Sequence, residues 1–247
     1  MKKFLYRFIL LICIGVFGFS AYQLYTIYAE KHQVEKENNT YTEMATSKKE
    51  DHKELDPDWE ALRAENGEII GWIYVPDCGD ISFPVVQTTD NSYYLNHTVS
   101  RADNIRGAIF LDYAADPYFT DDNSIIYGHS VDEGGMFTDL KKFADESYFD
   151  SHPNFYLLTP SGNYICHVFV FSKTTDSSVY YTTNFGDYPE EVIENMRAQA
   201  TYYNDVDTSL PMVTLSTCNL DYGFNSDQRF VLVGVLEPTD EPIMLED

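Results

Sequence analysis

Three side chains in this sequence could together perform acyl transfer: Cys218, His129 and Arg229. The cysteine and the histidine each follow a short apolar run that reads as a buried strand, and Arg229 opens a third such run, 230–236. If these strand ends meet, the thiol is the nucleophile, the imidazole moves protons and the guanidinium stabilises an oxyanion. The pattern therefore predicts a cysteine transacylase.

The neighbours of Cys218 favour a reactive rather than a structural thiol. A cysteine after an apolar strand is usually a buried structural residue. Here Ser216, Thr217 and Asn219 are polar, which predicts that the thiol leaves the core. Arg229 is close enough in sequence to lie on the adjacent antiparallel strand, and a nearby cation favours the nucleophilic thiolate.

His129 is distinguished from the other histidines by its position. It follows a strand that ends in Tyr127-Gly128, where glycine lets the backbone turn and expose the next side chain. An imidazole at this place suits general acid work on a leaving amine. The other histidines lie in a polar N-terminal stretch, in loops or within a strand: His32, His52, His97, His152 and His167.

An arginine at the start of a strand is commonly a surface residue, and Arg229 considered without its neighbours would be one. Beside a thiol and an imidazole, its guanidinium would supply two fixed donors to a developing oxyanion, which a lysine cannot reproduce. The cysteines and histidines lack the spacing of a zinc site, and no phosphate-binding glycine loop is present. We therefore expect neither a metal nor a cofactor.

The composition bounds the class of protein. The chain has 247 residues and a net charge of -24, with 44% hydrophobic and 15% aromatic residues. This length and composition predict one sizeable folded domain with appendages. So acidic a surface repels a phosphate backbone, which argues against nucleic acid as a partner.

Four cysteines are present: Cys13, Cys78, Cys166 and Cys218. Cys13 lies in the apolar N-terminal segment and cannot pair with the others. An extracellular domain would then hold an odd number of cysteines and at least one free thiol. The sequence leaves open whether Cys78 and Cys166 form a disulfide.

The N-terminus predicts a membrane anchor. An apolar stretch runs from Phe8 to about Tyr28, and roughly 20 apolar residues span a bilayer as a helix. Basic residues flank only its front, which keeps the N-terminus in the cytoplasm and places the folded domain outside the cell. A cleaved signal peptide is the alternative, but no Ala-x-Ala site follows and three tyrosines resemble an interfacial belt. The basic residues are Lys2, Lys3 and Arg7, and the tyrosines are Tyr22, Tyr25 and Tyr28.

The pattern divides the chain into four segments. Residues 1–29 are the anchor, 30–54 a polar, partly helical linker or stalk, 55–238 the catalytic domain and 239–247 a loose acidic tail. The domain begins at Asp56-Pro57-Asp58, and an Asp or Pro start followed by Trp59, Leu62 and Arg63 predicts a short capped helix, which Asn66-Gly67 ends.

Short strands dominate the domain. A short helix is expected over 136–143, and Pro189 to Tyr203 forms an amphipathic helix before the cysteine strand. Pro84 implies an edge strand or a bulge. Many strands with few helices predict a mostly β fold with accessory helices and a closed or nearly closed barrel. The expected strands are 70–75, 81–86, 108–111, 124–127, 155–158, 164–171, 212–215 and 230–236.

Three motifs resemble those of the sortase family. Thr214 to Cys218 matches the family pattern Thr-Leu-x-Thr-Cys, Tyr127 to Ser130 matches the histidine pattern, and Arg229 matches the arginine. The resemblance covers about residues 55–237. Within the family the chain looks like class B, because the segments 59–73, 84–87 and 91–95 and the helix before the cysteine strand are similar to that class.

The resemblance implies a sortase-like closed β-barrel of about eight strands with an N-terminal helix. It implies a membrane-anchored cysteine transpeptidase that cleaves a C-terminal sorting signal after Thr, of Asn-Pro-x-Thr or Leu-Pro-x-Thr-Gly type. The partners would be secreted proteins with that signal and an amine of peptidoglycan precursor or cross-bridge. His129, Cys218 and Arg229 would be catalytic. Candidates for the substrate groove are Asn91, Leu95, Tyr127, Ser216 and Thr217.

Two alternatives stay open at this point. A pilin polymerase of the same fold would use the same reactive residues and differ only in its acceptor, a lysine of the next pilin. A catalytically silent, membrane-tethered binding domain would keep Cys218 buried and unreactive.

Overall fold

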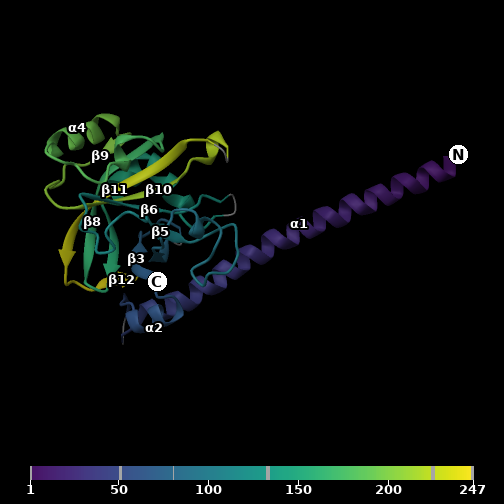
Figure 1. Cartoon of the computed structure of the whole chain (residues 1–247), viewed down its shortest axis with the longest axis horizontal. Helices are drawn as coiled ribbons and strands as arrows, with labels where there is room; N and C mark the ends of the chain where they lie inside the picture. Colours follow the sequence, from purple (N-terminus) through teal and green to yellow (C-terminus); the bar gives the residue numbers. More distant parts are fainter. Residues whose placement is uncertain (1, 50–51, 80, 132–133, 224–225, 246–247) are drawn as a thin grey trace.

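The structure, a computed structural model, describes residues 2–49, 52–79, 81–131, 134–223 and 226–245. One long helix, α1, projects from a body built mostly of strands (Figure 1). The strands are β1 (Thr46–Lys48), β2 (Lys53–Leu55), β3 (Ile69–Tyr74), β4 (Ser82–Val86), β5 (Ile109–Leu111), β6 (Asn123–Tyr127), β7 (Asn154–Thr159), β8 (Gly162–Thr175), β9 (Tyr202–Tyr203), β10 (Met212–Cys218), β11 (Gln228–Thr239) and β12 (Ile243–Leu245).

Eight of these strands close into a barrel. They follow the order β11-β10-β6-β5-β4-β3-β7-β8, and β8 pairs back with β11 along a register from Gln228↔Thr175 to Thr239↔Asn163. β9 pairs with Val170 and Phe171 of β8, beyond the residues of β8 that pair with β7. The predicted closed barrel of about eight strands with accessory helices is thus confirmed.

The barrel is closed around an apolar core. Side chains that alternate along the strands meet inside, among them Ile73, Leu157, Leu215 and Leu232, all fully buried. Burial of one such side chain contributes about 1.5–3 kcal/mol. The strand ends, where this alternation stops, are therefore free to carry polar and reactive residues.

Pro84 lies inside β4, opposite Trp72 of β3. β4 is an interior strand of the sheet, so the expectation of an edge is wrong, but β5 pairs only with Val85 and Val86. Pro84 therefore has no strand partner on its β5 side. The register with β3 also shifts between Ile69 and Gly71, as a bulge would do.

The helices lie outside the barrel. α2 (Trp59–Glu65) begins where predicted, because the Asp58 carboxylate accepts a hydrogen bond from Ala61 N. The predicted helix over 136–143 is a 3-10 helix, η2 (Thr138–Ala144). The remaining helices are η1 (Tyr93–Leu95), α3 (Glu146–Ser151), η3 (Val179–Tyr181), α4 (Pro189–Gln199) and η4 (Leu220–Tyr222).

α4 is shorter than the predicted helix, which extended to Tyr203. The chain turns to an extended conformation at Ala200, with ψ of 143°, and Tyr202 and Tyr203 pair with Phe171 and Val170 of β8. Pairing with a barrel strand satisfies the backbone groups that another helical turn would have used, so tertiary contacts override the local helical pattern.

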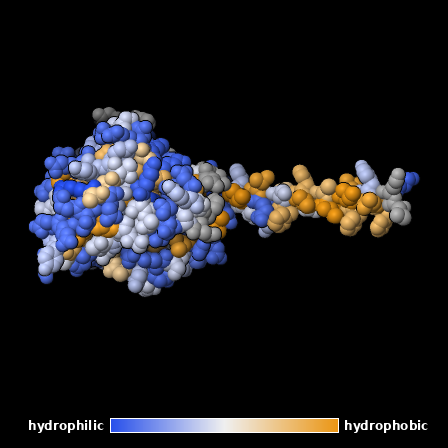
Figure 2. All heavy atoms as spheres, turned by 90° about the horizontal axis from the view of Figure 1, so that it is seen from above, coloured by the Kyte–Doolittle hydropathy of each residue, from blue (hydrophilic) through white to orange (hydrophobic). Residues whose placement is uncertain are grey.

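α1 (Lys2–Ala45) is continuous through most of the segment that we expected to be a linker. Its N-terminal part is apolar and stands clear of the hydrophilic body (Figure 2). By length and composition this helix could cross a membrane. Its C-terminal part packs against the folded domain, where Tyr41 and Ala45 are buried in one apolar cluster with Leu55 and Leu62.

The acidic tail is not loose at Ile243–Leu245. These residues form β12, which pairs antiparallel with β2 in a small sheet that also contains β1. Ile243 is 4% exposed and lies opposite Leu55. Leu245, two positions on, also packs against the apolar cluster that contains Ile243 and Leu55, and these contacts explain why a segment so rich in acids is ordered. Residues 246–247 lie outside the described part of the chain.

Candidate active site

Cys218 is the last residue of β10 and lies directly opposite Arg229 of β11 in the antiparallel register. Side chains at directly opposed positions have Cβ atoms about 4.5–5.5 Å apart. The thiol is half-buried, whereas Thr217 and Asn219 on either side of it are almost fully buried. β10 and β11 thus bring the predicted nucleophile and the predicted cation to the same point on the barrel rim.

His129 reaches the same rim from β6. β6 runs parallel to β10, with Tyr127 opposite Ser216, and Gly128 N donates to Ser216 O at 3.1 Å. Since parallel neighbours end on the same side of a sheet, the two residues after β6 emerge beside the end of β10. The hydroxyls of Ser130 and Thr217 are 2.9 Å apart and bridge the two chain segments. The residue after His129 is thus bonded to the residue before Cys218.

Gly128 is required by packing rather than by an unusual turn. A Cβ atom at this position would lie 2.5 Å from Ile109 Cδ1 and 2.7 Å from Phe137 Cδ2. Such distances are far inside van der Waals contact, so any larger residue would push the segment away from the barrel. The sequence identified the glycine but attributed its role to chain reversal.

The ring of His129 is oriented by a loop that joins β4 to β5. Its Nε2 is 2.8 Å from Leu95 O. A carbonyl oxygen only accepts, so Nε2 carries the hydrogen and donates it. Gly107 approaches the same ring edge, because a Cβ atom there would lie 3.1 Å from His129 Cδ2. Nδ1 therefore belongs to the opposite edge of the ring, away from Leu95 and Gly107.

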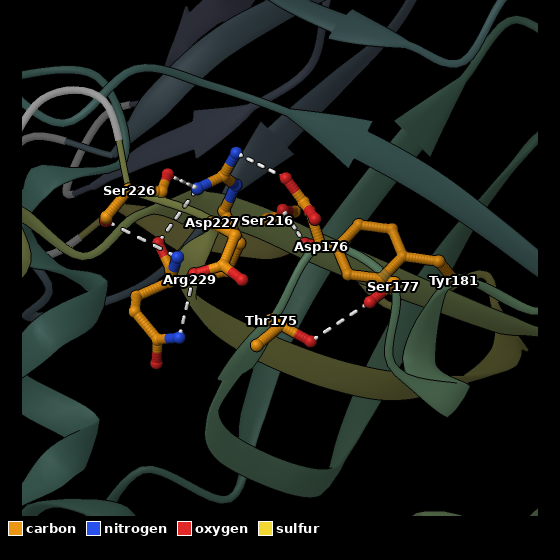
Figure 3. Close-up of polar contacts among 9 residues, drawn as sticks. Thr175, Asp176, Ser177, Tyr181, Ser216, Ser226, Asp227 and Arg229 are labelled. Atoms are coloured by element: carbon orange, nitrogen blue, oxygen red, sulfur yellow. Dashed lines mark hydrogen bonds and ion pairs between the residues drawn. The ribbon is translucent and has the colours of Figure 1, made fainter.

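The Arg229 guanidinium is held on two sides (Figure 3). Nη1 donates to Ser226 O at 2.8 Å and to Gln228 O at 2.9 Å, and Nη2 donates to Asp176 Oδ2 at 2.9 Å. Nε–H and the second hydrogen of Nη2 have no partner among the described residues. Asp176 was missed by sequence reasoning, because it enters the site only through the long pairing of β8 with β11.

Tyr181 is a second residue that the sequence did not reveal. Its hydroxyl is 2.6 Å from Ser216 Oγ (Figure 3). Burial raises the pKa of Tyr181 to about 12, against smaller lowering effects of the Ser216 hydrogen bond and of the Arg229 charge. Tyr181 therefore stays a neutral phenol that supports β10 close to the arginine.

The five candidates for the substrate groove fall into two groups. Leu95, Ser216 and Thr217 lie at the rim, but Ser216 and Thr217 are each 2% exposed, and their hydroxyls are bound to Tyr181 and Ser130. Leu95 is 37% exposed and contributes its carbonyl to His129.

Asn91 and Tyr127 instead converge on Asp112, which the sequence did not single out. Asn91 Nδ2 donates to Asp112 Oδ2 at 2.8 Å and the Tyr127 hydroxyl donates to the same oxygen at 3.0 Å. Burial, followed by the charge of Asp112, raises the pKa of Tyr127. The three side chains form one polar cluster beside the end of β6.

The remaining domain cysteines differ from Cys218. Cys78 and Cys166 are buried and free, so the disulfide that the sequence left open is not formed. Burial raises the pKa of the Cys78 thiol to about 12 and raises that of Cys166 well above its ordinary value. Both thiols are therefore neutral at physiological pH, and neither is a candidate nucleophile.

Among the described residues, no group of three or more His, Cys, Asp or Glu side chains is arranged to hold a metal ion. A wide hollow lies between α1 and the barrel, with Val34, Asn38 and Phe83 among its lining residues. None of His129, Cys218 and Arg229 lines it. The hollow is therefore separate from the rim that carries these three residues.

Several known proteins are similar to this chain in sequence and in fold. A family model described as the Sortase domain matches residues 73–237. Sortase B of Listeria monocytogenes is 31% identical over 244 residues, covering 96% of this chain and 98% of its own length.

Two solved structures are similar in fold. Sortase B of Bacillus anthracis in complex with AAEK1 has a TM-score of 0.73 and 29% identity, covering 86% of this chain and 100% of its own. The Staphylococcus aureus sortase B–substrate complex has a TM-score of 0.73 and 26% identity, covering 86% of this chain and 98% of its own.

Proposed function

This chain belongs to the sortase family and is a cysteine transpeptidase of the sortase B type, and we propose that it joins secreted proteins to a cell-wall amine. The observation that carries the proposal is the meeting of Cys218, Arg229 and His129 at one barrel rim through β10, β11 and β6. In this proposal the substrate is a C-terminal sorting signal, cleaved after its Thr.

The first step is attack of the Cys218 thiolate on the Thr carbonyl carbon. A C–S bond forms, and the carbonyl electrons move to oxygen to give a tetrahedral oxyanion. The position of Cys218 at a half-buried strand end supports this role, because a reactive thiol has to be reachable by a peptide.

Arg229 stabilises the oxyanion. Its two backbone-carbonyl bonds and its ion pair with Asp176 fix the plane of the guanidinium. The hydrogens left on Nε and Nη2 are available to a substrate oxygen. Donors that are already oriented need no rearrangement as charge develops, and this is why such groups lower the barrier effectively.

His129 transfers the protons. Nε2–H is donated to Leu95 O, so the proton that leaves the Cys218 thiol is carried by Nδ1, which makes the ring an imidazolium. Nδ1 gives this proton to the leaving amine as the C–N bond breaks, the oxyanion re-forms the carbonyl, and a thioester is left on Cys218. An amine of peptidoglycan precursor or cross-bridge then attacks the thioester and loses a proton to Nδ1. The new amide bond forms as the thiolate departs, so the enzyme is regenerated without a cofactor.

The apolar part of α1 supports membrane attachment. We propose that residues 1–29 span the cell membrane once, with the N-terminus in the cytoplasm and the catalytic domain, 55–238, outside the cell. An amine acceptor of the cell wall and a substrate that is still membrane-bound would both lie on that side. Asn91, Leu95, Tyr127, Ser216 and Thr217 remain our candidates for contacts with the sorting signal.

The full chain in bilayer nanodiscs tests the proposal. It is incubated with fluorescence-quenched peptides of Asn-Pro-x-Thr and Leu-Pro-x-Thr-Gly type, with and without an amine acceptor. We expect cleavage of one type, a product that shifts to the amine adduct, and loss of both in Cys218→Ala. Cys78→Ala is the matched control and should retain turnover. Cleavage that survives in Cys218→Ala, or an unreactive Cys218, contradicts the proposal.

A further inference from the structure

The part of α1 that follows the apolar segment is built into the catalytic domain. Tyr41 and Ala45 are buried in the apolar cluster around Trp72 and Tyr94, and Val34 packs against the main core. Because α1 is one continuous helix from the apolar segment to Ala45, the domain is joined to the proposed anchor through packed contacts and not through a flexible tether.

A loop over residues 96–107 is fastened to this helix by Asn104. The Asn104 side chain is 4% exposed, and its Nδ2 donates to Glu30 O at 3.0 Å and to Gln33 Oε1 at 3.3 Å. Ser100 also joins this loop to α1, because its Oγ donates to Glu37 Oε1 at 2.9 Å. A buried amide with both donors satisfied on one helix fixes the distance between helix and loop.

Asn104 is also bonded to the two ends of this loop. Its backbone N–H donates to Asn96 O at 2.8 Å, and its backbone carbonyl accepts from Gly107 N at 3.0 Å. Its side-chain Oδ1 accepts from Arg106 N at 3.0 Å. Movement of Asn104 would therefore move Asn96 and Gly107 with it.

The same two ends contact the ring of His129. Leu95, next to Asn96, presents its carbonyl to His129 Nε2, and Gly107 packs on the Cδ2 side of the ring. Both contacts lie on one edge of the imidazole. A continuous set of bonded and packed atoms thus runs from Glu30 and Gln33 of α1 through Asn104 to His129.

We propose that Asn104 is a positioning residue, through which the extracellular part of α1 holds the 96–107 loop and thereby sets the orientation of the His129 ring. This inference rests on the proposed function, because it assigns Asn104 an effect on proton transfer. Ring orientation decides whether Nδ1 reaches the leaving amine, and a displacement of about 1 Å can cost roughly a hundredfold in rate.

The test uses the full chain in bilayer nanodiscs and two variants. Asn104→Asp keeps the acceptor for Arg106 N but removes both donors to α1. Gln33→Ala removes one acceptor from the helix side and leaves the loop sequence intact. Lys36→Ala is the matched control, since Lys36 is an exposed residue of the same helix.

We expect Asn104→Asp to lower kcat for peptide cleavage by about tenfold to a hundredfold, with KM within about twofold of the unchanged chain. Gln33→Ala should lower kcat in the same way but less. Turnover is divided by the amount of alkylatable Cys218, so that misfolded protein does not count. A merely structural role would instead reduce the folded fraction and leave kcat per active site unchanged.

Amide hydrogen exchange provides a readout that does not need turnover. Amides of the 96–107 loop should exchange faster in Asn104→Asp and Gln33→Ala than in Lys36→Ala. Equal exchange and equal kcat in all three variants would overturn the inference. An unmodified chain that cleaves no peptide would instead refute the proposed function, and the exchange data would still decide whether α1 holds the loop.

Discussion

Ser130 and Thr217 share a hydrogen bond of 2.9 Å between their hydroxyls, and this bond joins the chain segments that carry His129 and Cys218. Both side chains are buried, with 9% and 2% exposure. The two proposed reacting residues are therefore held relative to each other by their chain neighbours, without a bond between the imidazole and the thiol. Each remains free to react.

Removal of this bond should reduce both stability and turnover. In Ser130→Ala the buried Thr217 hydroxyl loses its partner, which we expect to lower the free energy of unfolding by about 1–3 kcal/mol. The rate of peptide cleavage should fall because His129 is no longer fixed beside Cys218. Chemical denaturation and initial rates measure the two effects.

The control for this variant is Ser177→Ala. Ser177 also pairs with a hydroxyl, that of Thr175 at 3.3 Å, but in an exposed turn. Ser177→Ala should change neither the free energy of unfolding nor the rate of peptide cleavage measurably. Equal effects of Ser130→Ala and Ser177→Ala would show that the Ser130–Thr217 bond has no special role.

The three cysteines of the catalytic domain should differ in alkylation. Iodoacetamide at about pH 7 should modify the half-buried Cys218 and leave Cys78 and Cys166 unmodified. Raising the pH to about 10 should not add label at Cys78, because its pKa of about 12 keeps the thiol neutral over this range. Peptide mapping by mass spectrometry reads the sites, and labelling of Cys78 in folded protein would contradict the buried position described here.

Arg229→Lys should nearly abolish turnover while leaving the fold intact. Lysine keeps the charge but has neither the planar fork nor the spare N–H donors, so the oxyanion loses its stabilisation. We expect kcat/KM to fall by about 10²–10³-fold. Arg197→Lys on α4 is the matched control, because Arg197 pairs with Glu194 at the surface. Retention of full activity in Arg229→Lys would exclude the proposed role.

Ile243→Ala should destabilise the protein through the small sheet that pairs β12 with β2. Ile243 is buried opposite Leu55, and the truncation leaves a cavity, so the free energy of unfolding should fall by about 2–5 kcal/mol. Met244→Ala on the same strand is the control, since Met244 is 46% exposed and should change stability by less than about 0.5 kcal/mol. Denaturant titration measures the free energy of unfolding of both variants. An unchanged value in Ile243→Ala would mean that β12 does not contribute to stability.

The sequence by itself determined the elements and the chemical types of the rim residues. Strand periodicity located the eight barrel strands, the Asp-Pro-Asp run at 56–58 located the start of α2, and the strand-end positions singled out Cys218, His129 and Arg229. These features could be predicted because each depends on residues a few positions apart, where backbone preference and side-chain alternation act directly.

Only the tertiary structure decided which residues support those three. Asp176 meets Arg229, Tyr181 meets Ser216, and Asn104 joins α1 to the loop at His129. The same holds for the early end of α4 and the pairing of β12. Each of these contacts joins segments that are far apart in the chain, and strand pairing or helix docking brings them together. Their partners are therefore fixed by closure of the barrel and burial of its faces, which no local pattern encodes.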